Sequence, residues 1–228
     1  MKEDNYWIKY WQKNKIINQS NDHAKVGRTI KGKPISEIIW KKTLTHIFKE
    51  INLKKNDVVL DLAAGSGSLA FPMSLKSKHV IAVDISRKLL DSIPKRKNIS
   101  VLKGDIRFLK FENNTFDKII FNFAIQHFTD KEVIELSTKL FSWLKVGGSL
   151  YIGDIPDEAR LFKFYNNAER KKALFNSILQ NKPIIGNWFH KQFLKEVFKS
   201  AGFNHVVLKN QPPYFINAHY RFDLWIKK

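Results

Sequence analysis

The sequence predicts an α/β fold with a doubly wound, mostly parallel sheet of seven strands and helices on both faces. From residue 56 onward, short runs rich in β-branched residues alternate with segments of helical apolar spacing, which is the pattern of a parallel sheet. The chain has 228 residues, of which 43% are hydrophobic, and this is enough for one domain with one core.

Residues 1–50 precede this core and are predicted to form a helical appendage or lid. Four aromatic side chains lie at helical spacing near the start of the chain: Tyr6, Trp7, Tyr10 and Trp11. A helix of this kind either folds over a ligand or docks on the sheet as part of the core. A second helix is predicted over residues 35–49.

Residues 51–155 form the predicted binding core of the domain. Its five strands are expected where short apolar runs occur, at residues 58–60, 80–83, 99–102, 118–123 and 149–153. A helix is predicted over residues 132–144, and Gly147 and Gly148 are expected to end it before the fifth strand.

Residues 156–190 are predicted to be an insertion that covers the site, and residues 191–228 a helix followed by a pair of strands. The strands are expected at residues 205–209 and 220–227. The turn between them contains two prolines and is too short for a crossover helix, so these strands should pair antiparallel. No linker divides the chain, and residues 1–228 are predicted to be a single domain.

The composition excludes several functional classes. The chain contains 0 cysteines, which rules out a disulfide framework, a zinc-thiolate site and a cysteine nucleophile, and no metal site is predicted. No apolar run is long enough to span a bilayer, so we expect a cytoplasmic protein that does not insert into a membrane. The net charge of +19 makes nucleic acid a possible partner, but most basic residues are Lys, which favours a purely compositional origin.

A glycine loop follows the first core strand, and acidic residues follow three successive strands. The segment VVLDLAAGSGSLA, residues 58–70, indicates a strand, a tight loop with Gly65 and Gly67, and the start of a helix. With Asp84 after the next strand, it also satisfies a dinucleotide-binding fingerprint. However, the carboxylate of Asp61 would repel a pyrophosphate, whereas it suits a ligand that carries an ammonium and a sulfonium. Asp105 adds a hydrogen-bond acceptor after the third strand.

These motifs resemble those of the class I S-adenosylmethionine-dependent methyltransferases, whose fold is Rossmann-like, and the resemblance covers about residues 56–155. It implies S-adenosylmethionine as the cofactor and S-adenosylhomocysteine as the product. The loop from Asp61 to Gly67 would hold the methionine part, with Ala63 in place of the family's first glycine. The resemblance implies four further roles: Asp84 binds the ribose hydroxyls, Ile85 and Ile106 enclose the adenine, Asp105 accepts from its amino group, and Asn122 faces the transferred methyl.

Methyl transfer to a hydroxyl needs a general base near Asn122. His127 follows the fourth core strand and Asp154 follows the fifth, so both are candidate catalytic residues; the alternative is a structural role, packing for His127 and a helix cap for Asp154. The candidate substrate-binding residues are Arg28, His190, His219 and Tyr220.

Signatures of nucleic-acid methyltransferases are weak in this chain. The fourth core strand ends in Asn122-Phe-Ala-Ile, which lacks the prolines that such enzymes place around an exocyclic nitrogen. The tetrapeptide QPPY at residues 211–214 lies between the last two strands, and we interpret it as a turn. Without cysteine, cytosine C5 methylation through a covalent adduct is excluded.

The two ends of the chain, residues 17–36 and 217–228, resemble those of small bacterial methyltransferases associated with surface polysaccharide or small-molecule biosynthesis. This resemblance implies methyl transfer to an oxygen or nitrogen of a small, anionic metabolite such as a sugar or sugar nucleotide, which Arg28 could contact. A monomer or homodimer is expected. An RNA methyltransferase, or a partner subunit without catalysis, remains the alternative.

Overall fold

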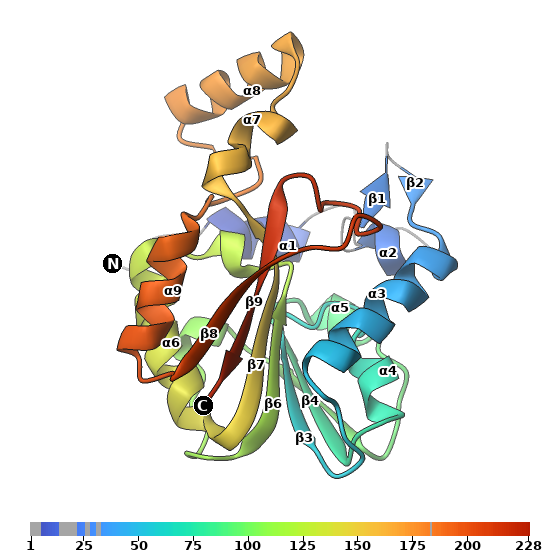
Figure 1. The fold of residues 1–228 in the computed structure, drawn as a ribbon. Helices are drawn as coiled ribbons and strands as arrows, with labels where there is room; N and C mark the ends of the chain where they lie inside the picture. Colours follow the sequence, from blue (N-terminus) through green and yellow to red (C-terminus); the bar gives the residue numbers. More distant parts are fainter. Residues whose placement is uncertain (1–5, 14–21, 26–27, 31–32, 183) are drawn as a thin grey trace.

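The computed structural model describes residues 6–13, 22–25, 28–30, 33–182 and 184–228, and within them a seven-stranded sheet forms the centre of the fold (Figure 1). The strand order is β5-β4-β3-β6-β7-β9-β8. The strands are β3 (Val58–Leu62), β4 (His79–Asp84), β5 (Ile99–Lys103), β6 (Phe116–Asn122), β7 (Leu144–Pro156), β8 (His205–Asn210) and β9 (Arg221–Lys227). Strands β3 to β7 are parallel, and β9 runs antiparallel to both of its neighbours. The predicted fold class is confirmed.

The order of the strands creates a crevice in the middle of the sheet. The chain proceeds from β3 outward to β4 and β5, and then returns to the other side of β3 to form β6. Loops that follow β3 and β6 therefore leave in opposite directions, and the carboxyl ends of these two strands are where open α/β sheets bind ligands.

Helices cover both faces of the sheet because successive residues of each strand point to opposite sides. On one face, α3 (Glu37–Glu50), α4 (Ala70–Ser74) and α5 (Arg87–Leu90) pack on a cluster that includes Val59 and Ile120. On the other face, α6 (Asp130–Trp143) and α9 (Lys191–Ser200) pack on a cluster that includes Leu60 and Ile119.

The junction between α6 and β7 differs from the prediction. The helix ends at Trp143, and Leu144 already pairs with Phe116, so Gly147 and Gly148 lie inside β7 rather than at a helix end. Gly147 has a φ of 76°, and the pairing of β6 with β7 shifts in register between Phe116 and Lys118. These glycines therefore belong to an irregular start of the strand.

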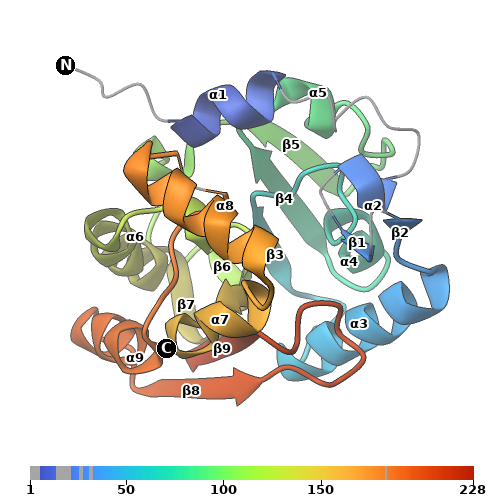
Figure 2. The same cartoon turned by 90° about the horizontal axis from the view of Figure 1, so that it is seen from above.

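The N-terminal segments and the insertion lie beyond the same end of the sheet (Figures 1 and 2). The N-terminal elements are α1 (Tyr6–Lys13), α2 (Asp22–Lys25), β1 (Thr29–Ile30) and β2 (Lys33–Pro34); the insertion forms α7 (Leu161–Phe164) and α8 (Ala168–Leu179). Short 3₁₀ turns occur at η2 (Ile106–Phe108), η3 (Ile125–His127) and η4 (Glu158–Arg160). Parts of the predicted appendage, residues 1–5, 14–21, 26–27 and 31–32, lie outside the described residues.

Within the described part of the chain, no helix is both long enough and apolar enough to cross a bilayer.

Candidate active site

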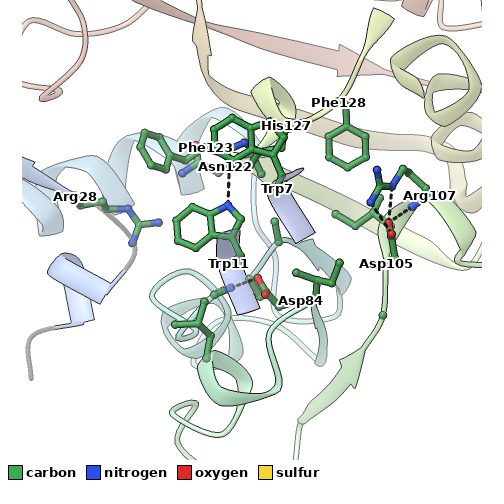
Figure 3. A pocket seen from close by; sticks show the side chains of 18 residues that line it. Trp7, Trp11, Arg28, Asp84, Asp105, Arg107, Asn122, Phe123, His127 and Phe128 are labelled. Carbon is green, nitrogen blue, oxygen red and sulfur yellow. Dashed lines mark hydrogen bonds and ion pairs between the residues drawn. The ribbon is translucent and has the colours of Figure 1, made fainter. Parts of the chain in front are cut away.

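A pocket opens at the carboxyl ends of β3, β4, β5 and β6, in the crevice that the strand order creates (Figure 3). It encloses about 820 Å³ of space, part of it open to solvent, which is a size that suits a nucleoside-sized ligand. Its wall combines loops from four strands with two side chains of α1. The lining residues include Ala63, Gly65, Asp84, Ile85, Asp105, Ile106, Arg107, Asn122, Phe123, His127, Trp7 and Trp11.

The loop after β3 adopts the tight conformation that its small residues allow. Ala63 and Gly65 have φ angles of 58° and 57°, in the left-handed region that normally favours glycine. Both line the pocket. Gly67 has a different role: its φ is 79°, and an added Cβ would lie 2.8 Å from the side chain of Ile93. Gly67 is not among the lining residues, so it allows the loop to pack rather than contacting a ligand.

Asp84 lies at the pocket edge at the end of β4 and is 7% exposed. Its two carboxylate oxygens accept backbone N–H groups, one from Gly65 at 2.9 Å and one from Ser86 at 2.8 Å. Burial raises the pKa of Asp84, and these backbone donors oppose the rise. Each oxygen keeps a further lone pair, so the carboxylate can also accept from a pair of hydroxyls.

Asp61 lies near the end of β3 and is 1% exposed. Its Oδ2 atom has no hydrogen-bond partner among the described residues, and it lines neither of the two pockets described here. Burial raises its pKa to about 7, while the nearby cation Arg28 acts in the opposite direction. A buried acceptor that lacks a donor fits a ligand that carries an ammonium group, as the methionine part of S-adenosylmethionine does.

The part of the pocket formed by the loop after β5 contains an ion-pair network that the sequence did not reveal. Asp105 accepts from Arg107 through both of its oxygens, at 2.9 Å from Nε and 2.7 Å from Nη2. The guanidinium also donates to Glu132 at 2.9 Å. Ile85 and Ile106 line the pocket beside this network. The predicted adenine acceptor Asp105 is therefore held in place by Arg107, and the only sequence signal was the two-residue spacing of an acid and a base.

His127 lines the pocket from the turn after β6 and contacts two tryptophans of α1 (Figure 3). Its Nε2 accepts the indole N–H of Trp11 at 3.1 Å, and its ring centroid is 4.1 Å from that of Trp7. Burial, with a smaller contribution from Arg221, lowers its pKa to about 3. His127 is therefore neutral at pH 7 and its Nε2 lone pair is occupied, which makes it a poor general base in this arrangement.

A second pocket adjoins the first, and both are lined by Arg28 and Asn122. The guanidinium of Arg28 lies 4.4 Å from the ring centroid of Trp40 and donates to the hydroxyl of Ser68. Burial lowers the pKa of Arg28 to about 10, and the carboxylates of Asp154 and Asp61 oppose this effect. Arg28 and Asn122 thus form a shared wall between the two pockets.

Asp154 lies in the second pocket rather than in the first. Its φ is 63°, and its backbone N–H donates to Asp223 at 2.8 Å. Its side-chain oxygens accept from the amides of Gln211 and Asn217, both at 3.3 Å. The structure therefore separates the two candidate bases: His127 faces the larger pocket and Asp154 the smaller one.

The other predicted substrate-binding residues line neither pocket. His190 is exposed at the start of α9, and exposed His219 packs its ring against Tyr220 at 4.8 Å. Tyr220 is buried and donates to Asn217 at 3.0 Å. None of the described residues between 156 and 190 lines either pocket, so this part of the insertion lies beyond the site without forming its wall.

Comparisons with known proteins find methyltransferases. A family model described as a methyltransferase domain matches residues 59–148. The chain is 28% identical over 171 residues to a ubiquinone/menaquinone biosynthesis C-methyltransferase, UbiE, of Wigglesworthia glossinidia brevipalpis, covering 71% of this chain and 66% of that protein. It is 32% identical over 105 residues to phosphoethanolamine N-methyltransferase 1 of Triticum aestivum, covering 41% of this chain and 20% of that protein.

Solved structures show the same fold. Phosphoethanolamine N-methyltransferase 1 of Haemonchus contortus, in complex with phosphoethanolamine and S-adenosylhomocysteine, matches with a TM-score of 0.69 and 14% identity over 97% of this chain. A protein of Nostoc punctiforme described as a putative O-methyltransferase matches with a TM-score of 0.64 and 18% identity over 83% of this chain. The chain spans about half the length of these two proteins, 47% and 57% respectively.

The fold, the pocket and the match of residues 59–148 to a methyltransferase domain together indicate the class, a class I S-adenosylmethionine-dependent methyltransferase. Its cofactor is S-adenosylmethionine.

Proposed function

We propose that this protein transfers a methyl group from S-adenosylmethionine to an oxygen or nitrogen of a small, anionic metabolite such as a sugar or sugar nucleotide. The observation that carries the proposal is the shared wall, because it places a cation, Arg28, and an amide, Asn122, between a cofactor-sized pocket and a smaller one. A methyl donor in the first and an acceptor in the second would meet at this wall, and Arg28 would attract the anion of the acceptor.

Each side chain then has a defined task. S-adenosylmethionine, when bound, supplies a methyl group on a sulfonium sulfur that keeps the electron pair and leaves as S-adenosylhomocysteine. Asp84 would hold the ribose and Asp61 the ammonium of the methionine part, as the resemblance implies. Asn122 would orient the acceptor atom, and Asp154, the carboxylate of the smaller pocket, would take the proton that this atom releases.

The relatives support the small-molecule part of this proposal more than its chemical detail. One is named for phosphoethanolamine, which is a small anionic molecule, and its solved counterpart holds that compound. The UbiE relatives are named as C-methyltransferases of quinone biosynthesis. The relatives reported above are not named for polysaccharide biosynthesis, so a sugar acceptor rests on the resemblance of the chain ends alone.

Two alternatives are tested together with the leading proposal. The net charge of +19 favours an RNA acceptor. A partner subunit that keeps the pocket without catalysis would bind the cofactor and transfer nothing. The proposal also includes a cytoplasmic monomer or homodimer, which size-exclusion chromatography and cell fractionation would test.

The deciding experiment is transfer of labelled methyl from S-adenosylmethionine into a cell extract that has been divided into a small-molecule fraction and a nuclease-sensitive polymer fraction. The expected result is label in small molecules that bind an anion exchanger. The native chain should produce this label, and the control variant Asp84→Asn should not. Label confined to the polymer would establish the RNA alternative. Cofactor binding without any transfer would favour the partner subunit.

A further inference from the structure

The smaller pocket has one polar end and several apolar walls. The polar end consists of Asn122, Asp154, Gln211 and Arg28, and it meets the cofactor pocket at the shared wall. The walls are mostly apolar and come from α3, the segment before it and the loop between β8 and β9; they are Ile35, Trp40, Ile47, Phe215 and Ile216. An occupant that matches this surface has an apolar body and a polar group at the end that faces the shared wall.

Hydrogen bonds fix the orientation of the Gln211 amide. Its Nε2 donates to Asp223 at 2.8 Å and lies 3.3 Å from Asp154. An amide nitrogen belongs between two carboxylates, because the reverse orientation would place an oxygen acceptor against both of them. Asp223 is itself held by the hydroxyl of Tyr151 at 2.8 Å and by the backbone N–H of Asp154 at 2.8 Å.

The Oε1 atom of Gln211 is left as a buried acceptor. Gln211 is 7% exposed, and this oxygen has no hydrogen-bond partner among the described residues. The neighbouring carboxylate of Asp154 has two long side-chain amide contacts of 3.3 Å and an ion pair with Arg221 at 3.8 Å, so it too has room for a closer donor. A buried acceptor without a donor is unfavourable, so this end of the pocket is suited to a ligand that donates hydrogen bonds.

We infer that the smaller pocket binds the methyl acceptor by its nucleophilic end: a hydroxyl or amine on a small apolar body donates to Gln211 Oε1 and to the Asp154 carboxylate. An anionic substituent of the same molecule would face Arg28. The inference rests on the proposed function, which it narrows: the apolar walls favour a small acceptor with an apolar body over the sugar or sugar nucleotide given there as examples. It also gives a ligand-binding role to Gln211 of the QPPY turn, which sequence analysis interpreted only as a connection.

Three probes with one body and different polar groups test this inference: benzyl alcohol, benzylamine and toluene. Their dissociation constants are measured by ligand-observed NMR, with and without S-adenosylhomocysteine. We expect the alcohol and the amine to bind the native chain at least about tenfold more tightly than toluene, since only they donate to the buried acceptors. The variant Gln211→Met, which keeps the side-chain length, should reduce this preference to less than about threefold.

Two further variants complete the design. Asp154→Asn keeps the size and tolerates the left-handed backbone, and it should remove any preference for benzylamine over benzyl alcohol. Gln192→Met replaces an exposed glutamine of α9 and should bind all three probes as the native chain does.

Binding of S-adenosylhomocysteine is titrated in every variant and reports whether the fold and the cofactor pocket are intact. The inference would be overturned if the native chain bound toluene as tightly as the alcohol and the amine. It would also be overturned if Gln211→Met kept the full preference for the alcohol and the amine over toluene. Failure of all three probes to bind a chain that still binds S-adenosylhomocysteine would also overturn it and leave the proposed function standing. Failure of the native chain to bind S-adenosylhomocysteine would instead contradict the proposed function.

Discussion

Replacing His127 by Phe tests whether the structure holds this side chain as a neutral imidazole. Burial lowers the pKa of His127 from 6.5 to about 3, so the folded chain binds no proton there between these values, whereas the unfolded chain does. The free energy of unfolding therefore falls as the pH falls through this window. From about pH 7.5 to about pH 5.5, the loss attributable to His127 amounts to about 1.4 kcal/mol.

The assay is urea unfolding followed by tryptophan fluorescence at both pH values. The Phe variant loses the hydrogen bond from Trp11, but this cost applies at both pH values and cancels in the difference. We expect the native chain to lose about 1.4 kcal/mol more than His127→Phe on acidification. The variant His190→Phe, at an exposed site, is the matched control and should behave like the native chain. Equal losses in the native chain and His127→Phe would refute the reasoning and reinstate His127 as a candidate base.

Three other predictions concern the carboxylates and the strained loop. Asp84→Asn should weaken binding of S-adenosylhomocysteine at least about tenfold in isothermal titration calorimetry, because a neutral amide accepts less strongly from the ribose hydroxyls; unchanged affinity would contradict the assigned role. Ala63→Val should lower the free energy of unfolding by about 2 kcal/mol, since a β-branched residue is strained at a φ of 58°, whereas Ala63→Gly should be tolerated; similar urea midpoints for all three chains would be inconsistent with this strain. The pKa of Asp61 is raised to about 7, so the native chain should lose stability as the pH rises from about 5 to about 8; Asp61→Asn should lose about 2.6 kcal/mol less, and parallel pH profiles would rule this out.

The sheet was predictable because its signals are local. Each strand contains a short apolar run between polar segments, and the turn before β9 was too short for any connection other than an antiparallel one. The exact ends of the helices and strands were harder to predict. Leu144 pairs with Phe116 of the neighbouring strand, and this pairing, rather than Gly147, decides where α6 ends and β7 begins.

The positions of Asp84, Asp105 and Asn122 around one pocket could also be anticipated. Residues that follow parallel strands meet at the same edge of a sheet, so their order along the chain is enough to bring them together. His190 and His219 had no such constraint, because they lie in a helix start and a loop whose direction depends on packing. Both are exposed in the structure.

The sequence by itself determined the fold class and the set of acids around the cofactor pocket, because strand periodicity and loop composition act over neighbouring residues. Only the tertiary structure decided which distant side chains meet. Trp11 donates to His127 across 116 residues, and Gln211 reaches Asp154 across 57. Such contacts depend on how elements pack and on which polar atoms burial leaves without partners. For this reason the separation of His127 from Asp154, both of them candidates from the sequence, and the Gln211 acceptor left unpaired among the described residues became visible only in the folded chain.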